Sequence, residues 1–383
     1  MPSMRGNRHF VRRPHQEKDI SACGIIGFIN RDGTRVSGDA IIRSIANMHD
    51  RGNGLGGGFA AYGIYPEHAD AYALHIMYDD ERAIADTEAL IRNTLETEHA
   101  ETIPVHPNGT VTEYPEFRRY FCHPPDVDER DADEYMVRLV MRINAKIEGA
   151  YVVSSGRNMG AFKGVGFPED LAEFFCLQEY EAYLWTAHNR FPTNTPGWWG
   201  GAHPFTLLDW SIVHNGEISS YGINRRYLES FGYACTLMTD TEVVAYIFDL
   251  LVRRHGLSFE QAATVMAPPF WQDIDRMPPD EAAEATALRQ TYASAALNGP
   301  FAFLFGYNGG LIGLNDRVKL RPLVVAERGD TVYMASEESA IRVVSPDLDT
   351  LFYPVAGQPV IARLYSETAE NTSVAHGGTV HGD

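Results

Sequence analysis

Cys23 stands at the head of a short apolar run, CGIIGFI (23–29), directly after 22 residues of a different character. A cysteine in such a place is usually a small buried residue. If the chain were cleaved after residue 22, however, the α-amine of Cys23, with a pKa of about 7.7–8.0, would lie beside its own thiol. One residue would then supply both nucleophile and base, and no catalytic histidine would be needed.

Three later segments contain residue types that suit the same chemistry. They are HNRFPTNT (188–195), HNGEI (214–218) and TDTE (239–242). Taken one at a time, each has a simpler structural explanation. An arginine at a strand end is usually a surface charge, an Asn-Gly pair is usually a turn, and Thr239 with Glu242 has the spacing of a helix capping box. None of the three is evidence of function alone.

Together these segments provide what hydrolysis of an amino-acid side-chain amide requires. The guanidinium of Arg190 suits the α-carboxylate of the substrate, and the carboxylate of Asp240 suits its α-ammonium. The side-chain amide of Asn215 and the backbone N–H of Gly216 are two donors for a tetrahedral oxyanion. With Cys23 as nucleophile, the set predicts an enzyme that hydrolyses the side-chain amide of a free amino acid.

The composition argues against several other classes of function. Hydrophobic residues make up 44% and charged residues 22% of the 383, which is typical of a globular chain, and the net charge of −19 disfavours nucleic acids and anionic membranes as partners. No stretch approaches the roughly 20 apolar residues of a membrane span. The four cysteines lie far apart, which disfavours metal clusters and disulfides and indicates a cytoplasmic protein.

The predicted elements suggest how these residues are positioned. Strands are expected at 23–29, 59–65, 71–78, 150–155, 183–190, 210–215, 301–307, 310–315, 321–328 and 331–336. Helices are expected at 37–50 with Ser37 as the cap, 80–99, 131–148, 239–255 and 280–297. An irregular surface excursion is expected at 100–130, with the acidic run 126–134 as a solvated helix start. Strands in meander-like pairs favour an α+β layered fold over a parallel βαβ array.

The motifs together resemble the class II glutamine amidotransferases, which use an N-terminal cysteine, and are most similar to the glutaminase domain of glutamate synthase. The matching pieces, in the family's order, are CGIIG (23–27), MHDRGNGLGGG (48–58), HNRFPTNT, HNGEI and TDTE. LNDR (314–317), LRPL (320–323) and MASE (334–337) are similar to the family's late hairpin. VVSSGRNMGAFKGVG (152–166) is similar to the glutamate synthase branch.

The resemblance implies that Cys23 is the catalytic nucleophile, freed by removal of a propeptide, and that Asn215 and Gly216 stabilise the oxyanion. It also implies the fold of the N-terminal nucleophile hydrolases. That fold is a four-layer αββα sandwich of two antiparallel sheets, which belongs to the α+β class.

The substrate-binding residues follow from the same resemblance. Arg190 and Thr193 would hold the carboxylate end of glutamine, and Asp240 would bind its α-ammonium. Phe191 and His214 would complete the substrate site. L-glutamine is therefore the expected small-molecule partner.

We expect a leader over 1–22, a type 2 amidotransferase domain over 23–365 and a flexible tail over 366–383. The predicted reaction is hydrolysis of glutamine to glutamate and ammonia through a Cys23 thioester. The ammonia would pass to a separate synthase subunit of glutamate synthase type. No cofactor is expected on this chain, whereas FMN and an iron–sulfur cluster are the candidates for the synthase subunit.

Two other interpretations stay open at this point. An N-terminal nucleophile hydrolase acting on another amide would share the layered fold but lack the paired clamp for an amino acid. Alternatively, an uncleaved leader would leave Cys23 without a free amine and make the protein a non-catalytic regulatory subunit. The ammonia acceptor is not specified by these residues.

Overall fold

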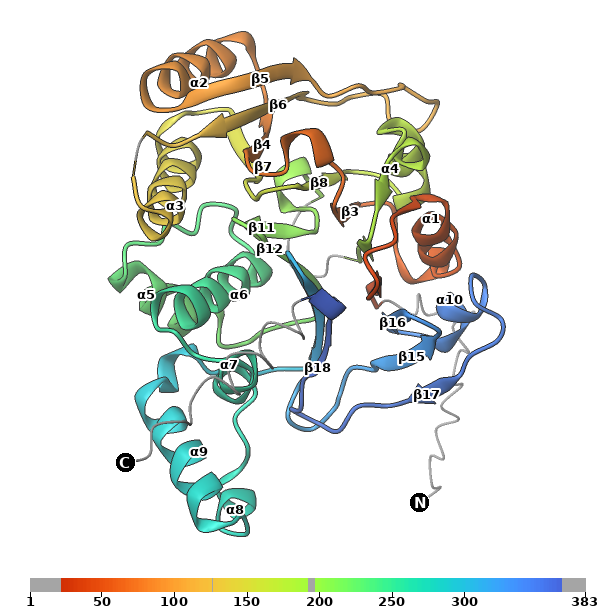
Figure 1. Cartoon of the computed structure of the whole chain (residues 1–383), viewed down its shortest axis with the longest axis vertical. Coiled ribbons are helices and arrows are strands. Elements are labelled where there is room, and N and C mark those ends of the chain that lie inside the picture. Colours follow the sequence, from red (N-terminus) through yellow and green to blue (C-terminus); the bar gives the residue numbers. More distant parts are fainter. Residues whose placement is uncertain (1–21, 126, 192–196, 367–383) are drawn as a thin grey trace, which may run out of the picture.

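The computed structural model describes residues 22–125, 127–191 and 197–366. Two antiparallel sheets lie against each other at its centre (Figure 1). The seven-stranded sheet consists, in spatial order, of β17 (Thr350–Phe352), β15 (Val324–Arg328), β16 (Thr331–Ala335), β1 (Gly24–Asn30), β10 (Leu184–Asn189), β3 (Gly57–Tyr62) and β8 (Met159–Gly164). The five-stranded sheet consists of β11 (Phe205–Leu207), β12 (Trp210–Gly216), β13 (Phe301–Tyr307), β14 (Gly310–Asn315) and β18 (Val360–Arg363).

Apolar side chains from both sheets fill the space between them. Ile26 and Ala187 of the larger sheet belong to one buried cluster with Val213 and Leu304 of the smaller sheet. The helices that cover the outer face of the larger sheet are α1 (Asp39–Ala46), α4 (Pro168–Phe174) and α10 (Glu338–Arg342). Those on the smaller sheet's side are α5 (Tyr221–Ser230) and α6 (Asp240–Asp249). The predicted α+β fold with αββα layers is confirmed.

A third antiparallel sheet, which the prediction did not include, stands beside the sandwich at the top of Figure 1. We call it the third sheet; it consists of β5 (Glu96–Thr102), β6 (Glu116–His123), β4 (Tyr72–Tyr78) and β7 (Ala150–Ser154), with helices α2 (Glu81–Thr94) and α3 (Glu129–Lys146). Apart from five three-residue 3-10 helices, the remaining elements of the described residues are the pair β2 (Val36–Ser37) and β9 (Glu181–Ala182), a π-helical turn (Leu250–Arg254), α7 (Phe259–Met266), α8 (Trp271–Ile274) and α9 (Pro279–Thr291).

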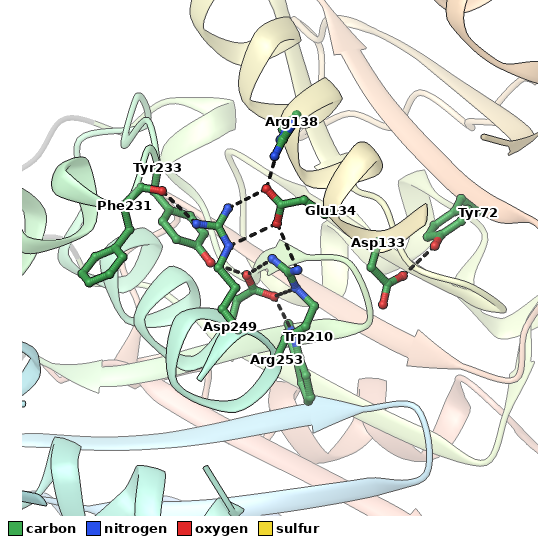
Figure 2. A network of polar contacts seen from close by, with 10 residues as sticks. Tyr72, Asp133, Glu134, Arg138, Trp210, Phe231, Tyr233, Asp249 and Arg253 are labelled. Carbon is green, nitrogen blue, oxygen red and sulfur yellow. Dashed lines mark hydrogen bonds and ion pairs between the residues drawn. The ribbon is translucent and has the colours of Figure 1, made fainter. Parts of the chain in front are cut away.

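A polar network at the end of α6 joins the third sheet's helix α3 to the sandwich (Figure 2). The fully buried carboxylate of Asp249 accepts two hydrogen bonds of 2.7 Å from Arg253 and one from the Tyr233 hydroxyl. Glu134 of α3 accepts from Arg253 at 3.2 Å and from Arg254 at 3.0 Å. The acidic run 126–134 is therefore not simply a solvated helix start, because Glu134 is a structural ion-pair partner.

Two predictions for the third sheet are wrong, because its strands β5 and β6 carry a weak apolar signal. The helix expected at 80–99 ends at Thr94, and β5 follows it with the polar, largely exposed sequence ETEHAET. The excursion expected at 100–130 contains β6, which pairs with both β4 and β5. An edge strand that faces solvent on both sides needs no hydrophobic alternation, so periodicity does not reveal it.

The start of the first helix is also corrected. Ser37 belongs to β2, and Gly38 occupies the N-cap position of α1. The Ser37 hydroxyl instead contacts the backbone N–H of Asp39 at 3.3 Å. The helix ends at Ala46, before the expected end at residue 50.

Within the residues that the structure describes, no helix is both long enough and apolar enough to cross a membrane. The predicted leader, apart from residue 22, and the predicted tail, apart from residue 366, lie outside the described residues.

Candidate active site

Strand register brings the predicted motifs to one cavity. β1 and β10 are antiparallel with Gly24 opposite Asn189, so Cys23 and Arg190 are neighbours just beyond the paired strand ends. A cavity of about 270 Å³ opens there. It is lined by Cys23, Arg190, Phe191, His203, His214, Gly216, Glu217, Ile218, Tyr221, Met238, Thr239, Asp240 and Thr241.

Hydrogen bonds hold both the side chain and the carbonyl group of Cys23. The N–H of Phe191 donates to the Cys23 sulfur at 3.3 Å, and Arg51 Nε donates to the Cys23 carbonyl oxygen at 3.1 Å. Burial raises the pKa of the Cys23 thiol, while the charges of Arg190 and Arg321 oppose that shift. A thiol in this state needs a nearby base before it can attack.

Two opposite charges line the cavity with Cys23. Arg190 is 4% exposed, and burial lowers the pKa of its guanidinium. Asp240 is the first residue of α6, and its Oδ2 accepts the backbone N–H of Ile218 at 2.9 Å. A carboxylate at a helix N-terminus is stabilised by the helix dipole. The site thus offers a cation and an anion at fixed positions around one thiol.

The start of α6 contains half of the predicted capping box. The Thr239 hydroxyl accepts the N–H of Glu242 at 3.1 Å, as the spacing predicts. The carboxylate of Glu242 does not reach back to Thr239. It accepts the N–H groups of Thr236 at 2.9 Å and Leu237 at 3.0 Å, and thereby holds the loop that leads into the helix.

Asn215 and Gly216 end strand β12 beside the cavity. Asn215 is fully buried, and its Nδ2 donates to the Ser336 hydroxyl at 3.4 Å. A side-chain amide has two N–H groups, so one further donor remains for a ligand. Gly216 has φ +142°, and a Cβ there would lie 2.0 Å from the carbonyl oxygen of Pro300, so only glycine fits.

Three buried histidines pack at the cavity, where His203 and His214 line it, and burial lowers the pKa of all three. His188 and His203 stack with ring centroids 3.9 Å apart, and His188 Nε2 lies 2.9 Å from the carbonyl oxygen of His214. Burial lowers the pKa of His188 to about 3 and also lowers those of His203 and His214. A general base should have a pKa near the operating pH. The free α-amine of a processed Cys23 fits that requirement better.

The structure places seven of the eight predicted site residues near one another. Six of them line the cavity, and Asn215 directly precedes the lining residue Gly216 on β12. Thr193 lies outside the described residues.

Sequence reasoning missed several residues that support the site. Arg51 pairs with Glu337, and Ser336 accepts the N–H of Ile25 at 3.2 Å as well as the Asn215 amide. The signal was present in the turn at 48–58 and in MASE (334–337), which were matched as motifs without roles. Thr241, inside TDTE, was also overlooked.

Comparisons with known proteins show which family the chain is similar to. A family model for the class-II glutamine amidotransferases matches residues 71–349, well over half of the chain, and begins downstream of Cys23. An uncharacterized protein of Archaeoglobus fulgidus is 52% identical over 96% of this chain and 98% of its own length. A Methanothermobacter thermautotrophicus protein, provisionally named a glutamine amidotransferase, is 26% identical over 84% of this chain and 93% of its own.

Among solved structures, the glutamine phosphoribosylpyrophosphate amidotransferase from B. subtilis matches with a TM-score of 0.47 and 16% identity. The match covers 89% of this chain and 47% of that chain.

Proposed function

Because the chain belongs to the class-II glutamine amidotransferases, we propose that it hydrolyses L-glutamine to L-glutamate and ammonia with Cys23 as the nucleophile. The observation that carries this proposal is that Cys23, Arg190 and Asp240 line one cavity. A free amino acid has an α-carboxylate for Arg190 and an α-ammonium for Asp240. A glutamine side chain within a peptide has neither charge, so the pair selects the free amino acid.

The first step requires Cys23 at the N-terminus of the mature chain. Burial keeps the thiol protonated, so the free α-amine must take its proton as the sulfur attacks the side-chain carbonyl carbon of glutamine. The C–S bond forms while the carbonyl electron pair moves onto oxygen. The Asn215 side-chain amide and the Gly216 N–H, at the end of β12, are the proposed donors to that oxyanion.

The second step releases ammonia. The C–N bond breaks as the α-ammonium of Cys23 returns its proton to the leaving nitrogen, and a γ-glutamyl thioester remains. Water then adds to the thioester with the α-amine as base, and the C–S bond breaks. Glutamate is released and the free thiol of Cys23 is regenerated. Atoms balance as glutamine plus water giving glutamate plus ammonia.

The experiment combines intact mass with an assay for released ammonia. We expect a mature form that begins at Cys23 and hydrolyses L-glutamine, and we expect no hydrolysis from a form that keeps residues 1–22. Cys23→Ala in the mature form should reduce turnover by at least about 10³-fold, as for other catalytic nucleophiles. Hydrolysis that survives this substitution would refute the assignment of Cys23.

We further infer that the ammonia is passed to a separate synthase subunit of glutamate synthase type. The support is the similarity of the segment 152–166 and of the other motifs to that branch. Such a subunit would carry the acceptor chemistry, with FMN and an iron–sulfur cluster as its candidate cofactors. The test is glutamine-dependent formation of glutamate from 2-oxoglutarate when a candidate subunit is added. Glutamine labelled with nitrogen-15 in its side-chain amide is the substrate in this assay. Hydrolysis of the labelled glutamine with no label in the glutamate formed from 2-oxoglutarate would exclude that acceptor.

A further inference from the structure

The hydroxyl of Thr241 occupies a junction in the wall of the cavity. Thr241 is the second residue of α6 and is fully buried. Its Oγ1 lies 2.9 Å from His203 Nε2, 3.1 Å from His214 Nδ1 and 3.2 Å from Asp240 Oδ1. One small group therefore contacts three polar residues of the substrate cavity.

Counting protons fixes the direction of these three contacts. A threonine hydroxyl has one proton to donate and two lone pairs to accept with, and an ionised carboxylate can only accept. The Thr241 proton must therefore go to Asp240 Oδ1, since otherwise two acceptor oxygens would face each other. Both imidazoles must then donate to the hydroxyl. His203 carries its proton on Nε2 and His214 carries its proton on Nδ1.

This arrangement holds the carboxylate of Asp240 from both sides. Oδ1 accepts the Thr241 hydroxyl at 3.2 Å, and Oδ2 accepts the N–H of Ile218 at 2.9 Å. With one protein donor on each oxygen, the carboxylate plane is fixed while lone pairs remain for a ligand. Charge-assisted hydrogen bonds of this kind are the stronger ones in proteins.

We propose that Thr241 is a positioning residue for recognition of the α-ammonium of the substrate. It acts by fixing the carboxylate of Asp240 and the tautomers of His203 and His214. The proposal rests on the proposed function in one respect, namely that Asp240 receives the ammonium. It adds a specificity-determining residue that acts on the ammonium through Asp240.

The alternative is that Thr241 only fills space in the packed start of α6. Thr241→Val separates the two roles, because valine keeps the branched shape and removes the hydroxyl. Thr241→Ser keeps the hydroxyl and removes the methyl group. Thr87→Val is the matched control, since Thr87 is a fully buried threonine of α2 in the third sheet and does not line the cavity.

The test measures binding rather than turnover, in the mature chain with Cys23→Ala. Calorimetry gives the Kd for L-glutamine and for 4-carbamoylbutanoate, which has the same amide and carboxylate but no α-ammonium. We expect Thr241→Val to weaken glutamine binding by about tenfold or more, the loss that one hydrogen bond to a charged group produces. The Kd for 4-carbamoylbutanoate should change less than twofold, and Thr241→Ser and Thr87→Val should leave both values near those of the parent.

Equal weakening of both ligands by Thr241→Val, or no weakening of either, would overturn the proposal. Because binding is measured without hydrolysis, the two proposals can fail separately. A mature chain with Cys23 intact that binds glutamine yet never hydrolyses it would contradict the proposed function and leave this inference standing. A parent chain that binds no glutamine would overturn both.

A second measurement needs no substitution at Thr241 and so does not depend on how a variant folds. Nitrogen-15 NMR of the imidazoles reports which ring nitrogen carries the proton. We expect the Nε2–H form at His203 and the Nδ1–H form at His214. The opposite tautomer at either residue would contradict the proton count.

Discussion

Buried polar groups are arranged in one way around the cavity and in another where the third sheet joins the sandwich. At the cavity, Nδ1 of His188 and of His203, Nε2 of His214 and Oδ1 of Asn215 are buried and have no hydrogen-bond partner among the described residues. At the junction, the carboxylate of Asp249 is fully buried and accepts from three side chains (Figure 2).

This difference in hydrogen bonding is the one expected between a ligand-binding site, here the cavity, and a structural network, here the junction. A buried polar atom without a partner costs free energy, so native proteins keep few of them away from functional sites. A cavity with unused hydrogen-bonding capacity can exchange it for contacts to a ligand. A fully satisfied network rigidifies the elements that it connects. Helix α6 carries both kinds of site, with Asp240 at its first residue and Asp249 at its last.

The largest effect should come from breaking the satisfied network. Asp249→Ala leaves the guanidinium of Arg253 and the hydroxyl of Tyr233 without their shared acceptor. Removing one partner of a buried ion pair typically lowers the free energy of unfolding by about 3–5 kcal/mol. Urea denaturation measures this loss. Glu338→Ala, which removes an exposed pair with Arg342, is the control and should cost less than about 1 kcal/mol.

The corresponding change at the cavity should affect catalysis and leave stability nearly unchanged. Asn215→Ala removes a proposed oxyanion donor, so kcat for glutamine should fall by about 10²–10³-fold. Cleavage of the leader should continue. Unchanged kcat would remove Asn215 from the oxyanion role, and a loss of stability as large as that of Asp249→Ala would erase the contrast between the two regions.

Asp209 provides a smaller, pH-dependent test near the junction. Burial raises the pKa of its carboxyl from 3.8 to about 6. As the pH rises from about 4 to 6, the unfolded chain loses this proton before the folded chain does, so stability falls by up to about 1.4 kcal/mol per pH unit. Asp209→Asn keeps an oxygen for the N–H of Arg157 and cannot ionise.

We therefore expect the stability of Asp209→Asn relative to the parent to increase across that pH window and to level off above it. Denaturation at several pH values measures the trend. A difference that stays constant from pH 4 to 7 would contradict it.

The smallest effect is expected on the outer part of the third sheet. Arg118 of β6 pairs with Glu88 at 2.6 Å and Glu116 at 2.7 Å, but its side chain is 29% exposed. Arg118→Ala should cost no more than about 1 kcal/mol, and the cost should shrink as salt is added. A larger, salt-independent loss would mean that this pair acts as a buried network.

The residue patterns predicted an α+β layered fold, the family resemblance implied the sandwich, and the structure brings seven of the eight predicted site residues together. Strands such as β1, β13 and β14 are buried at every position and appear as continuous apolar runs. Cys23, Arg190 and Asp240 each lie next to a strand or helix end, where a motif has a recognisable form.

The third sheet could not be predicted in the same way. β5 has Ala100 as its single apolar residue, and β6 (EFRRYFCH) has two adjacent arginines followed by two adjacent aromatic residues, so neither shows the alternation of a half-buried strand. The role of Thr241 was hidden for another reason. It depends on the positions of His203 and His214, which are distant in the sequence and approach Thr241 only after folding.

The third sheet has one more property that follows from its strand pairing. The chain enters it at Tyr72 and leaves it near Arg157, and these two residues form an antiparallel bridge. In topological terms it is an insertion with a single point of entry and exit, which a short connection could replace. The packing of the third sheet argues against such a replacement, because Leu74 and Ile76 are buried in one cluster with Val244 and Phe248 of α6. The insertion is therefore separable in connectivity but not in packing, and a chain shortened at this point would also need a repacked α6.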